Sequence, residues 1–327
     1  TGRRPSANAP SHGTAPRTLL DGDPGPLRPT LSIVIPNLDS PLVDRTLAAL
    51  SAQGAPGPPG SGIEVLVVGR DAPGLVPRDS VRFLESAERL SPAAARNLGV
   101  AQATGEHILF TDADCRPLPG WIDKLSAALE TAPVAGGGVT FPLDPAATSV
   151  WALADNIASF HDLLTDRPAE ANTRGAIGSL NLAVRRDAWE RVGPFDETLP
   201  TSEDFDWILR ARRLGLATAF VPDAVVEHAA VRRSRAELEG HATWYGRHFH
   251  RFRTLHPGVF DRGPTWRSKR LLRATAALKA VTGSLAIFRK HPSLRGCWRA
   301  FPGVVAFRRA WYRAVLEGWE GWEGKEG

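Results

Sequence analysis

Short apolar runs alternate with amphipathic stretches along the first two thirds of the chain. Residues 31–35 form an apolar, β-branched run that Pro36 ends, and residues 63–68 form a second run of this kind. Such runs predict buried strands. Residues 41–52 carry apolar side chains at a spacing of three and four, which predicts a helix. The same patterns predict further strands over 81–84, 107–111, 134–141, 177–184, 217–221 and 224–228, and further helices over 92–103, 119–131, 149–164 and 203–214.

This alternation of strands and helices predicts an α/β fold with a mostly parallel sheet and helices on both faces. From about residue 232 onward the pattern is helical and increasingly basic. We therefore expect three parts: a disordered tail over 1–29, which is rich in Pro, Gly, Ser, Thr and Ala, a catalytic domain over 30–230, and a helical extension over 231–327.

Two carboxylates one residue apart follow the predicted strand 107–111. Because ligands of a parallel sheet bind at the carboxyl ends of its strands, Asp112-Ala113-Asp114 lies where a ligand is expected. Carboxylates this close favour a divalent cation such as Mg²⁺ or Mn²⁺, which such sites bind together with substrate phosphates. The alternative is that Asp112 caps the next turn and Asp114 is solvated.

Two further groups carry possible chemistry. Glu203 and Asp204 open the predicted helix 203–214, where capping of the helix N-terminus is a sufficient explanation for both. His228 ends the predicted strand 224–228, and a lone histidine is more often packed or solvated than a ligand. Next to an Asp-X-Asp site, however, a neutral imidazole is a reasonable third metal ligand.

The ordered set of motifs over residues 30–230 resembles the family 2 glycosyltransferases. Each motif alone is weakly specific, and their order along the chain carries the resemblance. The segments that match are Ser32-Ile33-Val34-Ile35-Pro36, residues 63–68, Ala94-Ala95-Arg96-Asn97-Leu98-Gly99, residues 105–114, residues 179–186, residues 192–197, residues 203–207 and Val225-Val226-Glu227-His228.

The resemblance implies a GT-A, Rossmann-like fold and a metal-dependent hexosyltransferase that inverts the anomeric carbon. It implies that Asp112, Asp114 and His228 hold Mn²⁺ or Mg²⁺ on a nucleotide-sugar diphosphate, and that Asp204, assisted by Glu203, is the general base. Donor-binding positions are then Pro36, Asn37, Asp39, Arg70, Asp71, Arg96, Asp112 and Ala113, and acceptor-binding positions are Ser179, Asn181 and Trp207. Two of these assignments have structural alternatives, since Arg96 could lie on a helix surface and Trp207 could belong to the core.

One position departs from the family pattern. Relatives usually place one or two Asp residues directly after the second strand, where they contact the nucleoside base, whereas this chain has Gly69 and Arg70 there. Either Asp71 takes that role or Arg70 contacts the donor differently. Asp39, after the first strand, is another candidate for the nucleoside pocket, with a turn or capping role as its alternative. The identity of the base therefore stays open.

Charge is distributed unevenly. The net charge is +5, yet residues 262–313 hold 13 Lys and Arg and no Asp or Glu, and residues 314–327 hold one Lys and four Glu, which leaves residues 1–261 at 26 − 31 = −5. Five of the ten tryptophans lie in the last 62 residues. Basic helices with tryptophans suit a membrane interface or packing on the catalytic domain. Charge alone favours no nucleic-acid partner, because no recognition motif accompanies it.

The remaining sequence features bear on location and on competing functions. The chain has two cysteines far apart in sequence, no apolar signal-peptide core and no uncharged apolar window of about eighteen residues. These features favour a cytoplasmic protein without a transmembrane helix. If its acceptor is lipid-linked, we expect the protein to be peripheral at the inner membrane face. The expected partners are a nucleotide-sugar donor and an acceptor glycan, lipid-linked sugar or small molecule. A sugar-nucleotide nucleotidyltransferase is an alternative, but residues 36–40 are not its Gly-rich loop. A non-catalytic binding module is the other, supported only by Gly69 and Arg70.

Overall fold

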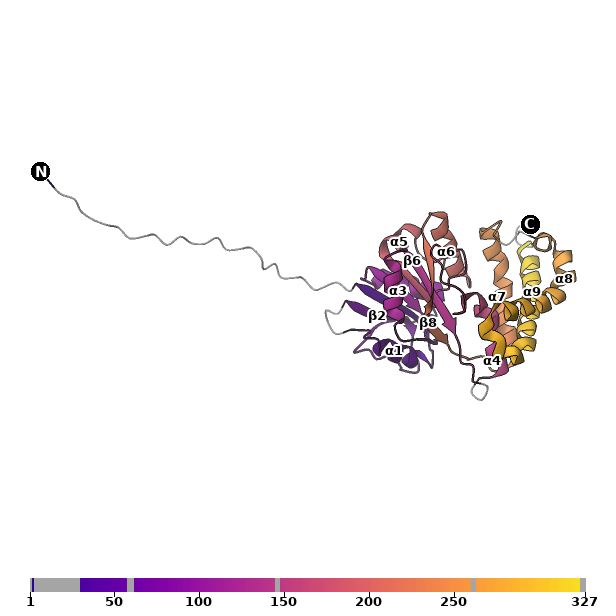
Figure 1. Cartoon of the computed structure of the whole chain (residues 1–327), viewed down its shortest axis with the longest axis horizontal. Helices are drawn as coiled ribbons and strands as arrows, with labels where there is room; N and C mark the ends of the chain where they lie inside the picture. The colour runs from indigo at the N-terminus through magenta and orange to yellow at the C-terminus, as the bar shows by residue number, and fades with distance from the viewer. Residues whose placement is uncertain (1, 3–29, 58–61, 145–147, 260–262, 324–327) are drawn as a thin grey trace.

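The computed structural model describes residues 2, 30–57, 62–144, 148–259 and 263–323. The tail predicted over 1–29 lies, apart from residue 2, outside the described residues. A sheet with helices on both faces occupies one side of the molecule, and three long helices from the C-terminal third gather on the other side (Figure 1).

The sheet contains eight strands in the order β3-β2-β1-β4-β7-β6-β8-β5 among the described residues. β1 to β4 run parallel, as do β6 and β8, whereas β7 and β5 run against their neighbours, so the predicted mostly parallel sheet is confirmed. The strands are β1 Leu31–Leu38, β2 Ile63–Arg70, β3 Arg82–Glu85, β4 His107–Thr111, β5 Cys115–Pro117, β6 Val134–Thr140, β7 Asn181–Arg185 and β8 Thr218–His228.

One strand replaces two predicted pieces. Residues 217–221 and 224–228 join into β8, because the pairing with β6 slips between Gly137 and Gly138 and lets the intervening residues bulge without ending the strand. The bulge keeps β8 in the sheet as far as His228, whose position on the sheet edge depends on it.

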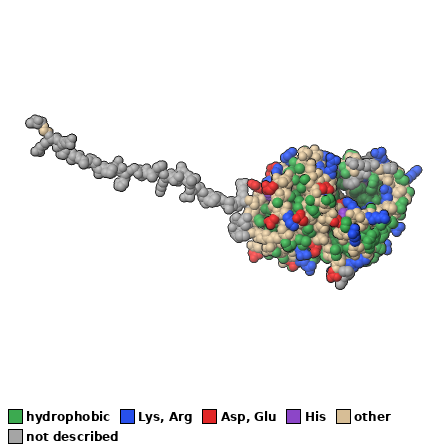
Figure 2. All heavy atoms as spheres, viewed as in Figure 1, with side chains coloured by type: hydrophobic (Ala, Val, Ile, Leu, Met, Phe, Trp, Pro, Cys, Tyr) green, Lys and Arg blue, Asp and Glu red, His purple; other side chains and the backbone are tan. Residues whose placement is uncertain are grey.

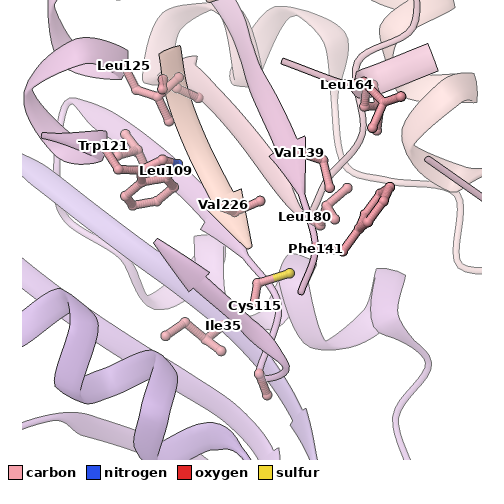
Figure 3. Close-up of a cluster of buried hydrophobic side chains, with 14 of the residues drawn as sticks. Ile35, Leu109, Cys115, Trp121, Leu125, Val139, Phe141, Leu164, Leu180 and Val226 are labelled. Atoms are coloured by element: carbon pink, nitrogen blue, oxygen red, sulfur yellow. The ribbon is translucent and has the colours of Figure 1, made fainter. Parts of the chain in front are cut away.

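Alternate strand residues face two separate cores. Ile33 and Ile35 point to the side of α1 and α3, whereas Val34 points to the side of α2, α5 and α6. Figure 3 shows the first core, where Trp121 and Leu125 pack on Leu109 beside Cys115 and Val226. The helices around the sheet are α1 Val43–Ser51, α2 Pro92–Gln102, α3 Trp121–Leu129, α4 Val150–Phe160, α5 Arg186–Val192 and α6 Glu203–Arg213.

The C-terminal helices are α7 (Arg235–Leu255), α8 (Lys269–Lys290) and α9 (Phe301–Glu323); α7 and α9 pack on the sheet domain through α4, and α8 packs on α9. Buried residues of this region belong to the same apolar cluster as the sheet. Glycines permit the close approaches: a Cβ on Gly303 would lie 2.6 Å from Ala154 Cβ, and one on Gly246 would lie 2.5 Å from the Trp311 carbonyl oxygen. Of the two roles weighed for the extension, packing on the catalytic part therefore holds for α7 and α9.

Helix α8 keeps an exposed apolar side. Leu278 is 65% exposed, and Leu271 and Val281 are exposed as well. By length and composition alone, α8 is the one helix among the described residues that is long and apolar enough to cross a membrane, and 28% of its apolar window is buried. Figure 2 shows Lys and Arg side chains prevailing over the C-terminal end of the molecule on this face.

Candidate active site

Two adjoining cavities lie at the carboxyl ends of β1, β2 and β4. The larger has a volume of about 420 Å³ and the smaller about 230 Å³. Both are lined by Arg96, Asp112 and Asp114, so the Asp-X-Asp turn stands between them. This is the edge of the sheet at which the sequence predicts ligand binding.

The Asp-X-Asp turn is held against His228 by the sheet. The Cys115 amide donates to the Asp112 carbonyl oxygen at 3.0 Å, and Cys115 pairs with His228 where β5 runs beside β8. This pairing brings His228 Nε2 to 3.6 Å from Asp114 Oδ2. The imidazole is 6% exposed, with the Phe160 ring centroid 4.6 Å from its own, so its orientation is fixed by packing.

The donor atoms at this turn fit a hard divalent cation. Oxygens of Asp112 and Asp114 lie within 4.8 Å of each other, with the imidazole of His228 beside them. At 3.6 Å, Asp114 and His228 are too far apart for a good hydrogen bond, which suits two groups that share an ion rather than a proton. Cys115 lies in the same group but is a poor ligand, because burial, followed by repulsion from Asp114, raises the pKa of its thiol well above the ordinary value.

Arg96 links the Asp-X-Asp turn to helix α6. Its guanidinium is 3% exposed and donates to Asp112 Oδ1 at 2.6 Å and to Glu203 Oε1 at 2.9 Å. Burial lowers the pKa of Arg96, but the neighbouring carboxylates, led by Asp112, outweigh burial and raise it. Arg96 is thus a buried cation between the turn and α6, and not the helix-surface residue of the alternative interpretation.

Asp204 points into the larger cavity from the first turn of α6. Its Oδ2 accepts from the Ser179 amide at 2.9 Å and from the Ser179 hydroxyl at 3.2 Å, while Oδ1 accepts from the Phe205 amide at 2.8 Å. Ser202, the residue before the helix, has φ of 65°, a strained value for a residue with a Cβ. These contacts hold the Asp204 carboxylate in one orientation, in the cavity that Asp112 and Asp114 also line.

Glu203 titrates unusually. Burial, followed by repulsion from Asp204, raises its pKa to about 7 despite the opposing attraction of Arg96. Since this pKa lies above the unfolded value, its contribution to stability is fully present below about pH 4.5 and is lost as pH rises through about 7.

We expect wild-type protein to lose more stability between pH 5 and 8 than a Glu203→Gln variant. The loss in the free energy of unfolding between pH 5 and 8 should differ by roughly 2 kcal/mol, because only the wild type has to ionise a buried carboxyl over this range. Urea unfolding of both proteins at each pH would measure it. Parallel stability–pH curves would contradict the raised pKa.

The smaller cavity explains the departure from the family pattern after β2. Gly69 has φ of +127°, and a Cβ there would lie 2.1 Å from the Asn37 carbonyl oxygen. No residue other than glycine fits, so an acidic side chain at this position is sterically excluded. Arg70 lines the cavity instead and pairs with Asp39 at 3.3 Å, with Pro36, Asn37 and Ala113 completing this wall.

Four predicted site residues line neither cavity: Asp39, Asp71, Asn181 and Trp207. Asp39 pairs with Arg70 and accepts from the Ala72 amide at 2.8 Å. Asp71 accepts from the Leu75 and Val76 amides and shapes the loop after β2, so it does not replace the missing acidic residue. Trp207 is fully buried, with its indole N–H donating to the Gly193 carbonyl, and Asn181 is 1% exposed and bonded to Trp121. The predicted acceptor contacts of Trp207 and Asn181 are therefore wrong, because both side chains are consumed by the core; Ser179 does line the larger cavity.

The sequence did not predict the far wall of the larger cavity. This wall comes from α4, α7 and α9, and Arg232 lies on it after β8. Its members from the C-terminal region are Arg232, His241, Trp244, Tyr245, Phe307 and Trp311. The only signal available was the aromatic content of these helices, which fits core packing equally well.

Comparison with known proteins places part of the chain in a family. Residues 32–192 match the model described as "Glycosyl transferase family 2". Over these residues the chain belongs to this family. The matched range includes β1, β2, β4, the Asp-X-Asp turn and β7.

Two curated relatives carry glycosyltransferase names. Glycosyltransferase AglE of Haloferax volcanii is 29% identical over 214 residues, which cover 62% of this chain and 67% of that protein. The pre-mycofactocin glycosyltransferase of Mycobacterium tuberculosis is 29% identical over 156 residues, or 45% of this chain, which spans about a third (32%) of that relative's length.

A solved structure shares the fold. It is the mannosyltransferase PcManGT from Pyrobaculum calidifontis, described in complex with GDP-Man and Mn²⁺. The TM-score is 0.53 at 19% identity, with 89% of this chain and 87% of that chain covered. The likeness supports the expected GT-A fold and extends into the C-terminal helices.

Proposed function

We propose that the chain is an inverting, metal-dependent glycosyltransferase that moves a sugar from a nucleotide-sugar diphosphate to an acceptor hydroxyl. The observation that carries the proposal is the placement of Asp112, Asp114 and His228 on one side of a cavity, with Asp204 on another. A diphosphate-binding group and a proton acceptor in one cavity are what single displacement at an anomeric carbon requires.

The chain's own residues have distinct parts in this reaction. Asp204, held by Ser179, takes the proton of the acceptor hydroxyl as its oxygen bonds to the anomeric carbon. The bond from that carbon to the diphosphate breaks in the same step, and its electron pair leaves with the nucleoside diphosphate. Mn²⁺ or Mg²⁺ on Asp112, Asp114 and His228 would stabilise the charge on the diphosphate. Attack opposite to the departing group inverts the carbon.

Glu203 has a supporting part in the proposed mechanism. Its bond to Arg96 ties the base-bearing turn of α6 to Asp112. We infer that Arg96 and Glu203 keep the two halves of the site in register.

The donor base is tested by a thermal-shift panel of GDP, UDP, dTDP and their sugar conjugates, including GDP-mannose, each with and without Mn²⁺. A ligand that binds only the folded state raises the free energy of unfolding, by about 2.7 kcal/mol at a concentration 100 times its Kd, and therefore raises the melting temperature. We expect a metal-dependent shift with one base, set by the Arg70–Asp39 pair. No shift with any member, or shifts equal with and without Mn²⁺, would contradict the proposal.

The alternative functions are less well supported. A nucleotidyltransferase would need a Gly-rich, basic loop after β1, where this chain has Asn37 donating to the Arg70 carbonyl. A non-catalytic module rests on Gly69 and Arg70 alone, and the steric requirement for Gly69 removes most of that support.

We further propose a peripheral membrane contact through residues 262–313. The exposed apolar residues of α8 are accompanied by an excess of Lys and Arg, a combination suited to an anionic bilayer surface. Vesicles containing phosphatidylglycerol should co-sediment the protein, and a Leu278→Asp variant should bind them several-fold more weakly. Equal binding to neutral vesicles, or an unaffected variant, would count against this contact.

A further inference from the structure

The wall of the larger cavity opposite the sheet is rich in aromatic rings. Trp244 and Tyr245 on α7 lie with ring centroids 5.1 Å apart, and Phe307 and Trp311 on α9 line the same wall. Trp244 is 41% exposed, so its ring is available at the cavity rather than consumed by packing. This wall belongs to the same cavity as Asp204, so a ligand resting on it can reach the proposed base.

Two residues that line the same cavity carry buried polar atoms without partners among the described residues. Ser159 Oγ and His161 Nδ1, at the end of α4 and just beyond it, are buried and have no hydrogen-bond partner among the described residues. The nearest carboxylate oxygen to His161 Nδ1 is that of Asp162 at 3.7 Å. Burial lowers the pKa of His161 to about 4, so the imidazole is neutral at physiological pH and can both donate and accept. Buried polar atoms of this kind are stable only when a ligand or water satisfies them.

Away from the Asp-X-Asp turn, the charges around the cavity favour an uncharged ligand. Both arginines that line it are already paired: Arg96 with Asp112 and Glu203, and Arg232 with Asp155 at 3.0 Å. Asp155 is itself buried and uses its other oxygen for His241 Nδ1 at 2.7 Å. An anionic ligand would thus meet the Asp204 carboxylate with no unpaired arginine to offset it.

We propose that the aromatic wall of α7 and α9, together with Ser159 and His161, is the acceptor site, and that it takes a neutral, hydroxyl-rich sugar ring. A pyranose has an apolar C–H face that can lie on Trp244 and a polar edge that can satisfy Ser159 and His161. The inference rests on the proposed function, because Asp204 would deprotonate one hydroxyl of that ring.

The test uses saturation-transfer NMR on the full chain with Mn²⁺ present. The probes are methyl hexopyranosides and methyl N-acetylhexosaminides, compared with a methyl glucuronide and a hexose phosphate. We expect a neutral glycoside to bind and the two anionic probes to bind at least tenfold more weakly. Trp244→Ala should weaken glycoside binding about tenfold or more, and Trp244→Phe, which keeps an aromatic face, by less than about threefold.

Two controls separate this inference from loss of folding. Trp298 is 46% exposed and lies outside the cavity, so Trp298→Ala should leave glycoside binding unchanged. Ser159→Ala, a smaller change, should weaken binding of the same glycoside several-fold without lowering the melting temperature. The proposal would be overturned if the Trp244→Ala and Ser159→Ala variants bound the glycoside as well as Trp298→Ala does. Tighter binding of the glucuronide or the phosphate, or no glycoside binding at all, would also overturn it.

Measurements on the donor alone distinguish failure of the acceptor-site proposal from failure of the glycosyltransferase proposal. Metal-dependent thermal shifts and slow donor hydrolysis depend on the Asp-X-Asp turn and need no acceptor. If they persist while no neutral glycoside binds, the acceptor assignment alone is wrong. If they are absent as well, the glycosyltransferase proposal fails with it.

Discussion

An Asp204→Asn variant is expected to lose sugar transfer by a factor of about 10²–10⁴ while binding its nucleotide donor almost as well as the wild type. That factor is the usual contribution of a general base, and an amide cannot accept the proton of the acceptor hydroxyl. The substitution preserves side-chain volume and leaves the metal-binding turn, on another wall of the cavity, untouched. Removing the negative charge beside Glu203 also relieves a repulsion, so the fold should not weaken for that reason.

The neighbouring Asp206 provides a matched control. It occupies the same helical turn, but its carboxylate is buried and bonds to Arg210 at 2.8 Å and to His256 at 2.9 Å. Asp206→Asn should therefore lower thermal stability and keep transfer, the reverse of Asp204→Asn. Steady-state transfer rates, donor titrations and melting temperatures of both variants would test this contrast. Transfer by Asp204→Asn at a rate comparable to wild type would exclude Asp204 as the base.

The sheet and the position of the Asp-X-Asp turn could be predicted because both depend on local pattern. Apolar runs of β-branched residues fix β1, β2 and β4, and the rule that ligands bind where parallel strands end then places Asp112 and Asp114 at the site. His228 required the motif order of the family, since nothing local distinguishes it from a packed histidine.

The acceptor-side assignments of Asn181 and Trp207 failed because contacts with residues far along the chain bury both side chains. Asn181 looks available in a strand, yet Trp121 donates to it and its amide donates to the Gly138 and Ala224 carbonyls. Trp207 lies three residues after Asp204, and only the assembled fold shows its ring stacked on Trp189 at 5.6 Å. Periodicity gives the face of a helix but not which neighbour covers it.

The far wall of the cavity could not be predicted for a related reason. Trp244 on α7 comes to the site because α9 packs on α4, through the close approach of Gly303 to Ala154. Neither the spacing of glycines nor the aromatic content of the sequence predicts such a contact. Gly69 shows the opposite case, in which a departure from family pattern has a steric cause that becomes visible only once Asn37 is placed beside it.

An Asp114→Ala variant should lose most of the metal-dependent part of donor affinity, at least about tenfold in Kd. Asp112 already gives one oxygen to Arg96 at 2.6 Å, whereas Asp114 pairs with no arginine or lysine among the described residues and lies 3.6 Å from Nε2 of His228. Asp114 is therefore the carboxylate with more capacity for a cation. Loss of a residue that only hydrogen-bonds a metal ligand typically lowers metal affinity about 10–100-fold, and loss of the ligand itself should matter more. Calorimetric titration of the donor with and without Mn²⁺ measures the effect, and Asp223→Ala, an exposed carboxylate paired with Lys124, is the control. If Asp114→Ala bound the donor with the wild-type affinity in Mn²⁺, the cation would have to lie elsewhere. The assignment of a donor side at the Asp-X-Asp turn and an acceptor side at α7 and α9 would then be wrong.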